Sequence, residues 1–366
     1  MNKIFISAGE VSGDYHAASL VRALKANIPD LTFWGIGRRK LREEGVKIVA
    51  SMKNYDIVGL DGLIKKGPLF SELTGRILSL INGTSVAVFV DYPGYNILLA
   101  RYFKKRGVRN VYYIAPQIWG WWRFRAKLVK RYFDMVLVIY PFEVDFWKKR
   151  GVDAIYVGNP VYDSILKEEI KPLSGIPENK KIVGLLPGSR YSEVKRILPY
   201  MMEVKKILEK KHRDLFFILS LVPDGIGVQD DDNLWVVRGR GKSVMKSSDV
   251  LIVASGTATL EGALLEKPMV VLYELSPLSY FIGGMVKRVD YLSLVNIMSN
   301  REVVKEFIQK IDVSEVAHEV EKLLFDNDRV NTIKAEYKRI KNNLSGNAPE
   351  NAARLIKRRF FNEKDD

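Results

Sequence analysis

Cysteine is absent from this chain of 366 residues, and histidine occurs only three times. Without cysteine, a disulfide framework, a thiolate metal site and a cysteine nucleophile are excluded. The histidines, His16, His212 and His318, lie far apart in the sequence, so the paired spacing of a histidine metal site is missing. The sequence therefore gives no sign of a metal centre.

Long apolar segments are also absent. The longest run without a charged residue is Ile77–Val90, and it contains the polar stretch Asn82–Ser85. A membrane-spanning helix needs about 20 predominantly apolar residues, so this run is too short to span a bilayer. No apolar signal segment precedes the first strand-like stretch, Ile4–Ala8, so we expect a protein that stays in the cytoplasm.

Acidic residues are outnumbered by basic ones. Asp and Glu total 43 against 58 Lys and Arg, which gives a formal net charge of +15. Apolar residues make up 47% and charged residues 28%, a balance typical of globular proteins, so wholesale disorder is excluded. The positive charge suggests a polyanionic partner, and the chain length favours two or at most three domains.

Short apolar runs alternate with helical patterns along both halves of the chain. The runs lack apolar–polar alternation, as expected for parallel strands covered on both faces. We expect strands at residues 3–8, 32–36, 46–50, 86–90, 111–114, 135–139, 181–186, 215–221, 234–237, 250–254 and 269–273. Helical spacing occurs at residues 17–26, 72–80, 97–106, 142–150, 193–211, 258–266, 314–325 and 349–361.

This alternation predicts an α/β protein of two doubly wound, Rossmann-like domains that face each other across a cleft. Residues 171–177 contain Pro, Gly and Ser and are typical of a linker. We therefore expect an N-terminal domain at 1–170 and a C-terminal domain at 171–345. A basic helix within 346–366 would pack on the N-terminal domain or on a second chain of a homodimer. Open parallel sheets bind ligands at the carboxyl ends of their strands.

The first predicted strand ends in a turn that contains Gly9 and Gly13. Two glycines allow backbone amides to approach a ligand at the start of the following helix. Glu10 and Asp14 lie in the same turn and suit sugar hydroxyls better than phosphate. The alternative is an ordinary tight strand-to-helix turn, which every such domain needs.

Asp91 follows the predicted strand 86–90 and would point into the ligand crevice. Partial desolvation there would raise the pKa of its carboxyl toward that of a useful general base. The alternative role is to cap the next helix, which aspartate does well. Pro93 and Gly94 intervene, so Asn96 is the better cap.

Two more strand-to-helix turns with glycine and hydroxyl residues occur in the second half. Residues 187–190 are Pro-Gly-Ser-Arg, and residues 255–257 are Ser-Gly-Thr. Such turns suit a diphosphate because they offer amides and hydroxyls at positive helix ends, and Arg190 adds a cation. The Walker and G-x-G-x-x-G fingerprints are both absent. We expect a nucleoside diphosphate, bound with neither a cofactor nor a protein-held metal.

Residues 101–131 hold ten Lys or Arg, eight aromatic residues and no acid. Arg and Trp together are typical of a face on anionic lipid. The same composition fits single-stranded nucleic acid, and a solvated basic helix beside an aromatic core is a third alternative. Residues 60–70 mix apolar residues with lysines and suit a membrane surface or a loop or short helix tucked onto its own domain. The expected membrane contacts are Leu63, Ile64, Leu69, Phe70, Trp119, Trp121, Trp122, Arg123 and Arg125.

Several of these segments resemble motifs of lipid-A-disaccharide synthases. The matching blocks follow the family's order at 8–14 (AGEVSGD), 91–96 (DYPGYN), 116–121 (PQIWGW), 141–143 (PFE), 186–190 (LPGSR), 254–261 (ASGTATLE), 268–271 (PMVV) and 290–296 (DYLSLVN). Each block by itself is weak evidence for the family, whereas all of them in the family's order are specific evidence.

The resemblance implies an inverting GT-B glycosyltransferase on the cytoplasmic face of the inner membrane. It implies transfer of 2,3-diacylglucosamine from UDP-2,3-diacylglucosamine to the 6-hydroxyl of 2,3-diacylglucosamine 1-phosphate. The products would be a β-1,6-linked disaccharide 1-phosphate and UDP. The anionic lipid surface of that membrane would be a further partner.

By the same resemblance, Asp91 corresponds to the family's proposed general base. The substrate and UDP contacts implied by the resemblance are Ser189, Arg190, Ser255, Gly256, Thr257, Glu261 and Asn296. Glu10, Gly13 and Asp14 of the first turn complete the expected substrate contacts. The chain departs from the family at Asn159, where members commonly have His, and at Val295, which replaces the usual Pro. Trp122 and Phe124 alter the segment after the tryptophan motif.

Other classes of protein fit part of the sequence. A UDP-sugar epimerase, or the transferase that builds the peptidoglycan lipid precursor, would share the second-half turns. The blocks around Glu10 and Asp91 are not expected in those enzymes. A non-catalytic nucleic-acid-binding protein would use the positive charge but would leave Asp91 and the glycine–hydroxyl turns without a role. We therefore expect no nucleic-acid partner.

Overall fold

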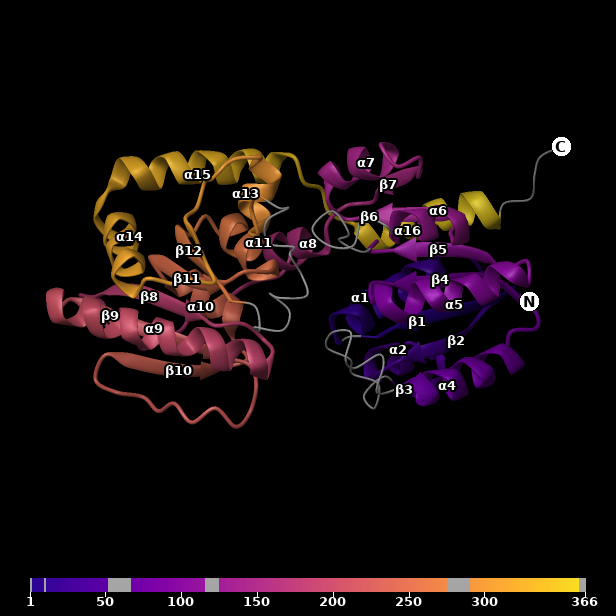
Figure 1. The fold of residues 1–366 in the computed structure, drawn as a ribbon, viewed down its shortest axis with the longest axis horizontal. Coiled ribbons are helices and arrows are strands. Elements are labelled where there is room, and N and C mark those ends of the chain that lie inside the picture. The colour runs from indigo at the N-terminus through magenta and orange to yellow at the C-terminus, as the bar shows by residue number, and fades with distance from the viewer. Residues whose placement is uncertain (1, 10, 52–66, 116–124, 275–289, 362–366) are drawn as a thin grey trace. The chain divides into compact units, whose positions relative to one another are not determined.

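The computed structural model describes residues 2–9, 11–51, 67–115, 125–274 and 290–361, which form two compact units (Figure 1). Unit 1 comprises Met1–Pro160 and Ser345–Asp366, and unit 2 comprises Val161–Leu344. The chain thus leaves unit 1 after Pro160, where the sequence suggested residue 170, and returns to it at Ser345.

Unit 1 is built on a parallel sheet. Its described strands are ordered β3-β2-β1-β4-β5-β6-β7, and each pairs in parallel with its neighbours. The last five residues of β1, β2 and β4 are all buried, as expected for strands covered on both faces. The strands are β1 (Asn2–Ala8), β2 (Leu31–Gly37), β3 (Lys47–Ser51), β4 (Thr84–Val90), β5 (Arg109–Tyr113), β6 (Met135–Val138) and β7 (Ala154–Tyr156).

Helices α1 and α2 of unit 1 pack against each other, as do α5 and α6. Three rings form the centre of the core: Phe5, Phe89 and Phe103 lie with their centroids 4.5 to 5.9 Å apart. These rings fix α5 over strands β1 and β4. The helices are α1 (Val11–Asn27), α2 (Arg39–Glu43), α4 (Gly67–Ser79), α5 (Pro93–Lys105), α6 (Arg125–Tyr132), α7 (Pro141–Lys148) and α16 (Ala348–Phe360), while α8 (Pro160–Leu166) begins at the division between the units.

Helix α16 returns the chain to unit 1 and packs on α1. Its buried face consists of three alanines and one isoleucine, and its outer face is basic and exposed. The junction before it is close-packed, because a Cβ on Gly158 would lie 2.5 Å from the Gly346 carbonyl oxygen. Asn159 is fully buried and donates to the Ile139 carbonyl (2.9 Å). This departure from the family pattern therefore supports the fold at the junction.

Unit 2 repeats the design with a second parallel sheet, ordered β10-β9-β8-β11-β12-β13 among the described residues. The strands are β8 (Lys181–Leu186), β9 (Leu215–Leu221), β10 (Leu234–Arg238), β11 (Val250–Ala254), β12 (Met269–Tyr273) and β13 (Glu306–Ile308). The helices are α9 (Tyr191–Lys211), α10 (Gly241–Ser247), α11 (Thr257–Leu264), α13 (Leu294–Ser299), α14 (Val313–Phe325) and α15 (Asn327–Asn342).

Each sheet has a point at which the strand order reverses. In unit 1 the chain builds β1 to β3 outward in one direction and then starts again beside β1 with β4. In unit 2 the same reversal separates β8 from β11. Ligands of open α/β sheets bind outside the carboxyl ends of the strands at such reversals, so these two edges are where a site is expected.

The structure contains elements that the sequence did not reveal. Strands β7 and β13 have three residues each, too few for an apolar run to stand out. Helix α15 has 16 residues, but its polar composition hides the helical period. Helix α1 starts at Val11, earlier than expected, so Gly13 and Asp14 belong to its first turns.

Candidate functional site

The unit 1 residues expected at a ligand site lie on two neighbouring turns. Strands β1 and β4 pair with Ala8 opposite Val90, so the turns that follow them are adjacent. The ring of Tyr92 packs over Gly9, since a Cβ atom on Gly9 would lie only 2.4 Å from the Tyr92 Cγ atom. Glycine is therefore required at this position by the neighbouring β4–α5 turn.

Asp91 and Tyr92 both have left-handed backbones, with φ of 48° and 47°. For residues other than glycine this conformation costs roughly 1–2 kcal/mol each, so neighbouring groups must hold it. The Asp91 amide donates to the Tyr113 carbonyl (3.2 Å). The Asp91 carbonyl accepts from Asn96 Nδ2 (2.8 Å) and from the Tyr112 hydroxyl (3.1 Å). The half-buried Asp91 is thus fixed at the carboxyl end of β4.

Helix α5 begins differently from the prediction. Tyr92 occupies the N-cap position and Pro93 is the first helical residue, whereas Asn96 lies within the helix. Proline fits there because its missing N–H is one that would have no helical partner. The capping roles that the sequence offered for Asp91 and Asn96 are therefore both wrong.

Tyr112 connects the Asp91 turn to helix α6. Burial, followed by the negative charge of Asp91, holds the pKa of the Tyr112 phenol well above its usual value, while the charge of Arg125 acts the other way. The phenol is therefore a neutral donor. Arg125 is half-buried at the start of α6, and burial lowers the pKa of its guanidinium. Its charge acts on this turn, and the membrane contact expected for it stays a prediction.

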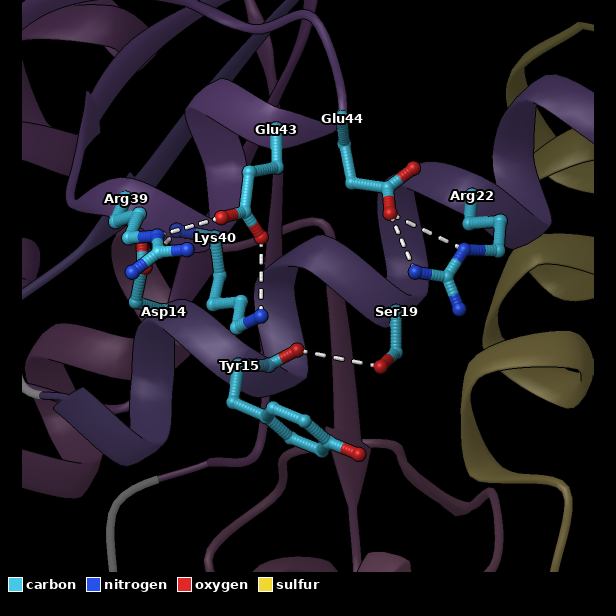
Figure 2. Close-up of polar contacts among 8 residues, drawn as sticks. All are labelled: Asp14, Tyr15, Ser19, Arg22, Arg39, Lys40, Glu43 and Glu44. Carbon is cyan, nitrogen blue, oxygen red and sulfur yellow. Dashed lines mark hydrogen bonds and ion pairs between the residues drawn. The ribbon is translucent and has the colours of Figure 1, made fainter.

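Asp14 is committed to the fold of unit 1. The residue is 2% exposed, and its carboxylate accepts from the backbone amides of Arg38 (2.6 Å) and Lys40 (2.8 Å), which fixes the start of α2. Figure 2 shows Asp14 beside α2, where Glu43 pairs with the side chains of Arg39 and Lys40. A direct sugar contact by Asp14 stays a prediction. Gly13 is buried one residue earlier in α1.

The two glycine–hydroxyl turns of unit 2 come from adjacent strands, because β8 pairs with β11 and Leu186 lies opposite Val253. Gly188 has φ of 110°, and a Cβ there would lie 2.1 Å from the Glu193 carboxylate. That carboxylate accepts from the Ser189 amide (3.2 Å). The side chains of Ser189 and Arg190 are exposed beyond this turn.

Helix α11 begins at the second of these turns. Gly256 is its N-cap, and Gly256 and Thr257 are both exposed. A helix start that no side chain caps leaves amide donors for a ligand; among the described residues none caps α11. One turn later, burial raises the pKa of the Glu261 carboxyl, and Lys242 opposes that shift. The turns at 187–190 and 255–257 thus both lie at the carboxyl ends of the central strands of unit 2.

Asn296 is fully buried and its amide is saturated within unit 2. The Nδ2 atom donates to Val304 (2.8 Å) and to Glu306 Oε1 (2.7 Å). The Oδ1 atom accepts from the amides of Val303 (2.8 Å) and Val304 (3.0 Å). An amide has two donors and two acceptor positions, so the Asn296 amide is fully used within unit 2, and the UDP contact expected for it stays a prediction.

Glu306 completes this network, although nothing in the sequence singled it out. Its carboxylate accepts from the amides of Leu292 (2.8 Å) and Ser293 (2.9 Å). Ser255 donates through Oγ to the Leu292 carbonyl (3.1 Å). The segment 290–296 is therefore attached to the turn that starts α11.

Several expected contacts lie outside the described residues: Glu10, Leu63, Ile64, Trp119, Trp121, Trp122 and Arg123. Leu69 and Phe70 fall within α4. In the described part of the chain, no helix is both long enough and apolar enough to traverse a bilayer.

Comparison with known proteins identifies the family. Residues 4–358 match the family model of lipid-A-disaccharide synthetase. The lipid-A-disaccharide synthase of Persephonella marina is 39% identical over 85% of this chain and 86% of its own length. That of Myxococcus xanthus is 36% identical over 88% of each chain.

Solved structures share the fold at much lower identity. The UDP-GlcNAc 2-epimerase of Neisseria meningitidis, bound to UDP-GlcNAc, superposes with a TM-score of 0.64 at 12% identity, over 97% of this chain and 98% of its own. The predicted fold class, two Rossmann-like domains of GT-B type, is thereby confirmed. The chain belongs to the lipid-A-disaccharide synthase family and is a glycosyltransferase of lipid A biosynthesis.

Proposed function

We propose that the enzyme transfers 2,3-diacylglucosamine from UDP-2,3-diacylglucosamine to the 6-hydroxyl of 2,3-diacylglucosamine 1-phosphate. The products are the β-1,6-linked disaccharide 1-phosphate and UDP. Family membership supports the reaction. One observation supports a donor site in unit 2. The turns at 187–190 and 255–257 are distant in sequence, yet they follow strands β8 and β11, which pair with each other.

The donor diphosphate is assigned to unit 2. Arg190 and Ser189 extend from one turn, and Gly256 and Thr257 start α11 at the other. A helix start and a guanidinium both favour phosphate oxygens. Glu261, one turn into α11, is assigned to the nucleoside or sugar hydroxyls. The solved epimerase with UDP-GlcNAc bound has the same fold, which supports a UDP-sugar as the donor.

The acceptor is assigned to unit 1, with Asp91 as general base. Its carboxylate takes the proton of the acceptor 6-hydroxyl while that oxygen attacks the anomeric carbon of the donor. One displacement inverts that carbon, and UDP leaves with its charge met by Arg190 and the amides of α11. A positioned base contributes typically ~10²–10⁴ in rate.

We assign the enzyme to the cytoplasmic face of the inner membrane, on anionic lipid. In the described residues this is supported by the outer stripe of α5, where Leu98 is 54% and Tyr102 is 40% exposed. Exposed Arg101 and Lys105 lie on the same stripe, since residues three, four and seven apart share a helix face. Neighbouring α6 adds exposed Lys127, Lys130 and Arg131.

UDP release tests the reaction directly. Purified enzyme with acylated donor and acylated acceptor should release UDP, whereas donor alone should release far less. Asp91→Asn should keep the fold and the UDP affinity and lose about 10²–10⁴ in turnover. Near-normal turnover of this variant would remove Asp91 from the role of base, and acceptor-independent UDP release would contradict the transfer reaction.

A further inference from the structure

The turn that carries Asp91 has a conformation that residues other than glycine rarely adopt. Asp91 and Tyr92 are consecutive left-handed residues, and such strained positions persist only where the surrounding structure determines them. The groups that hold this turn also set the direction of the Asp91 Cα–Cβ bond, because that direction follows from the backbone.

Asn96 holds the Asp91 turn through its side-chain amide. It is fully buried, and its Nδ2 atom donates to the carbonyls of Asp91 (2.8 Å) and Val90 (3.2 Å). The opposite oxygen, Oδ1, accepts from the hydroxyl of Ser7 (2.7 Å), a buried residue of β1. A reversed amide would place Oδ1 against two carbonyl oxygens, so the amide has one stable orientation. Ser7 thus anchors the Asn96 amide to the central strand.

Tyr112 holds the same carbonyl from another strand. Its hydroxyl, on β5, donates to the Asp91 carbonyl at 3.1 Å. A carbonyl oxygen has two acceptor positions, and Asn96 and Tyr112 supply one donor each. The Asp91 peptide is therefore fixed from two sides, and its Cα–Cβ bond is fixed with it.

We propose that Asn96, oriented by Ser7, is a positioning residue that directs the Asp91 carboxylate toward the acceptor hydroxyl. The proposal rests on the proposed function, in which Asp91 is the general base. Misplacement of a catalytic group by about 1 Å can cost on the order of 10² in rate. Loss of the Asn96 amide should therefore slow the chemical step without weakening the binding of UDP, which is assigned to unit 2.

The test is a double-mutant cycle. Asn96→Ala and Ser7→Ala are each made alone and together with Asp91→Asn, and kcat, KM and the pH profile of kcat/KM are measured by UDP release. With Asp91 present, Asn96→Ala should lower kcat about 10- to 100-fold and leave the UDP dissociation constant unchanged. With Asp91→Asn, the same change should alter the residual rate less than about twofold, because interacting residues are non-additive.

Asn110 provides a matched control in the same unit. It is fully buried, and its Nδ2 atom also donates to two carbonyls, those of Ala100 and Tyr132, both at 2.8 Å. It lies at the start of β5, at the amino ends of the strands, whereas Asp91 follows the carboxyl end of β4. Asn110→Ala should lower stability as Asn96→Ala does, but leave kcat of the folded enzyme within about twofold of wild type.

Equal losses from Asn96→Ala in both backgrounds, or an unchanged kcat, would overturn the positioning role while leaving the general base intact. Normal turnover of Asp91→Asn alone would instead overturn the base and the positioning role with it. If Asn96→Ala does not fold, Ser7→Ala and Tyr112→Phe decide the matter. Each should lower kcat severalfold with Asp91 and have no effect in Asp91→Asn, and additive losses would refute the proposal.

Discussion

The substitution Asn296→Ala tests whether Asn296 stabilises unit 2 or contacts a ligand directly. Both the family motif and the structure single out this residue. The substitution removes four buried hydrogen bonds, two from Nδ2 and two to Oδ1. At about 1 kcal/mol for each bond, with more for groups left unsatisfied, the free energy of unfolding of unit 2 should fall by about 3–5 kcal/mol. Proteins of this kind are stable by only about 5–15 kcal/mol.

Hydrogen exchange measured by mass spectrometry suits this prediction, because unit 1 peptides serve as an internal control. Core amides of β11 and β12 should exchange roughly 10²- to 4 × 10³-fold faster in the variant, since each 1.4 kcal/mol is tenfold. Peptides of β1 and β4 should be unaffected.

A matched variant, Asn331→Ala, lies on an exposed position of α15 and should change exchange in neither unit. Calorimetry on the folded fraction should give an almost unchanged affinity for UDP in Asn296→Ala. Unchanged exchange in unit 2 together with lost UDP affinity would refute this reasoning and return Asn296 to direct ligand contact.

Three further outcomes are expected. Arg190→Ala should weaken UDP binding by calorimetry and lower turnover as well, and unchanged binding would mean that the diphosphate lies elsewhere. Leu98→Ser with Tyr102→Ser should reduce sedimentation with vesicles rich in phosphatidylglycerol, relative to the exposed control Asn331→Ala, and equal sedimentation would exclude this face. Burial lowers the pKa of His16 from 6.5 to about 4, so the unfolded chain binds the proton first and stability should fall as pH drops from about 6.5 toward 4. In a plot of denaturation midpoint against pH, His16→Gln should show a smaller fall than the wild type over this range. Identical curves would show that His16 does not contribute to the pH dependence of stability.

The strands and the doubly wound class could be predicted because they depend on local patterns. Buried parallel strands such as β4 and β11 are nearly continuous apolar runs, and glycine with hydroxyl residues marks the turns after β8 and β11. A ligand site at the carboxyl ends of the strands then follows from the alternation of strand and helix. The strand order that makes these turns neighbours came only from the structure. Strands as short as β13 carry too few residues to give such a signal.

Partners distant in sequence could not be predicted. The sequence shows that Asn96 is polar near a helix start, but only the fold brings Ser7 beneath it, 89 positions away. Glu306 gives no signal at all, because an acid in a short polar segment is most often solvated. Asn296 matches a family motif, yet the motif does not tell whether its amide meets a ligand or the protein.

The return of the chain to unit 1 has a consequence for synthesis on the ribosome. Residues 161–344 are made between the two parts of unit 1, which at 5–20 residues per second takes about 10–40 s. During that interval the nascent α1 has no α16 to cover it, and by its end all the described strands of unit 2 have been made. Unit 2 can therefore finish folding first, and unit 1 is completed only when its last helix, α16, emerges.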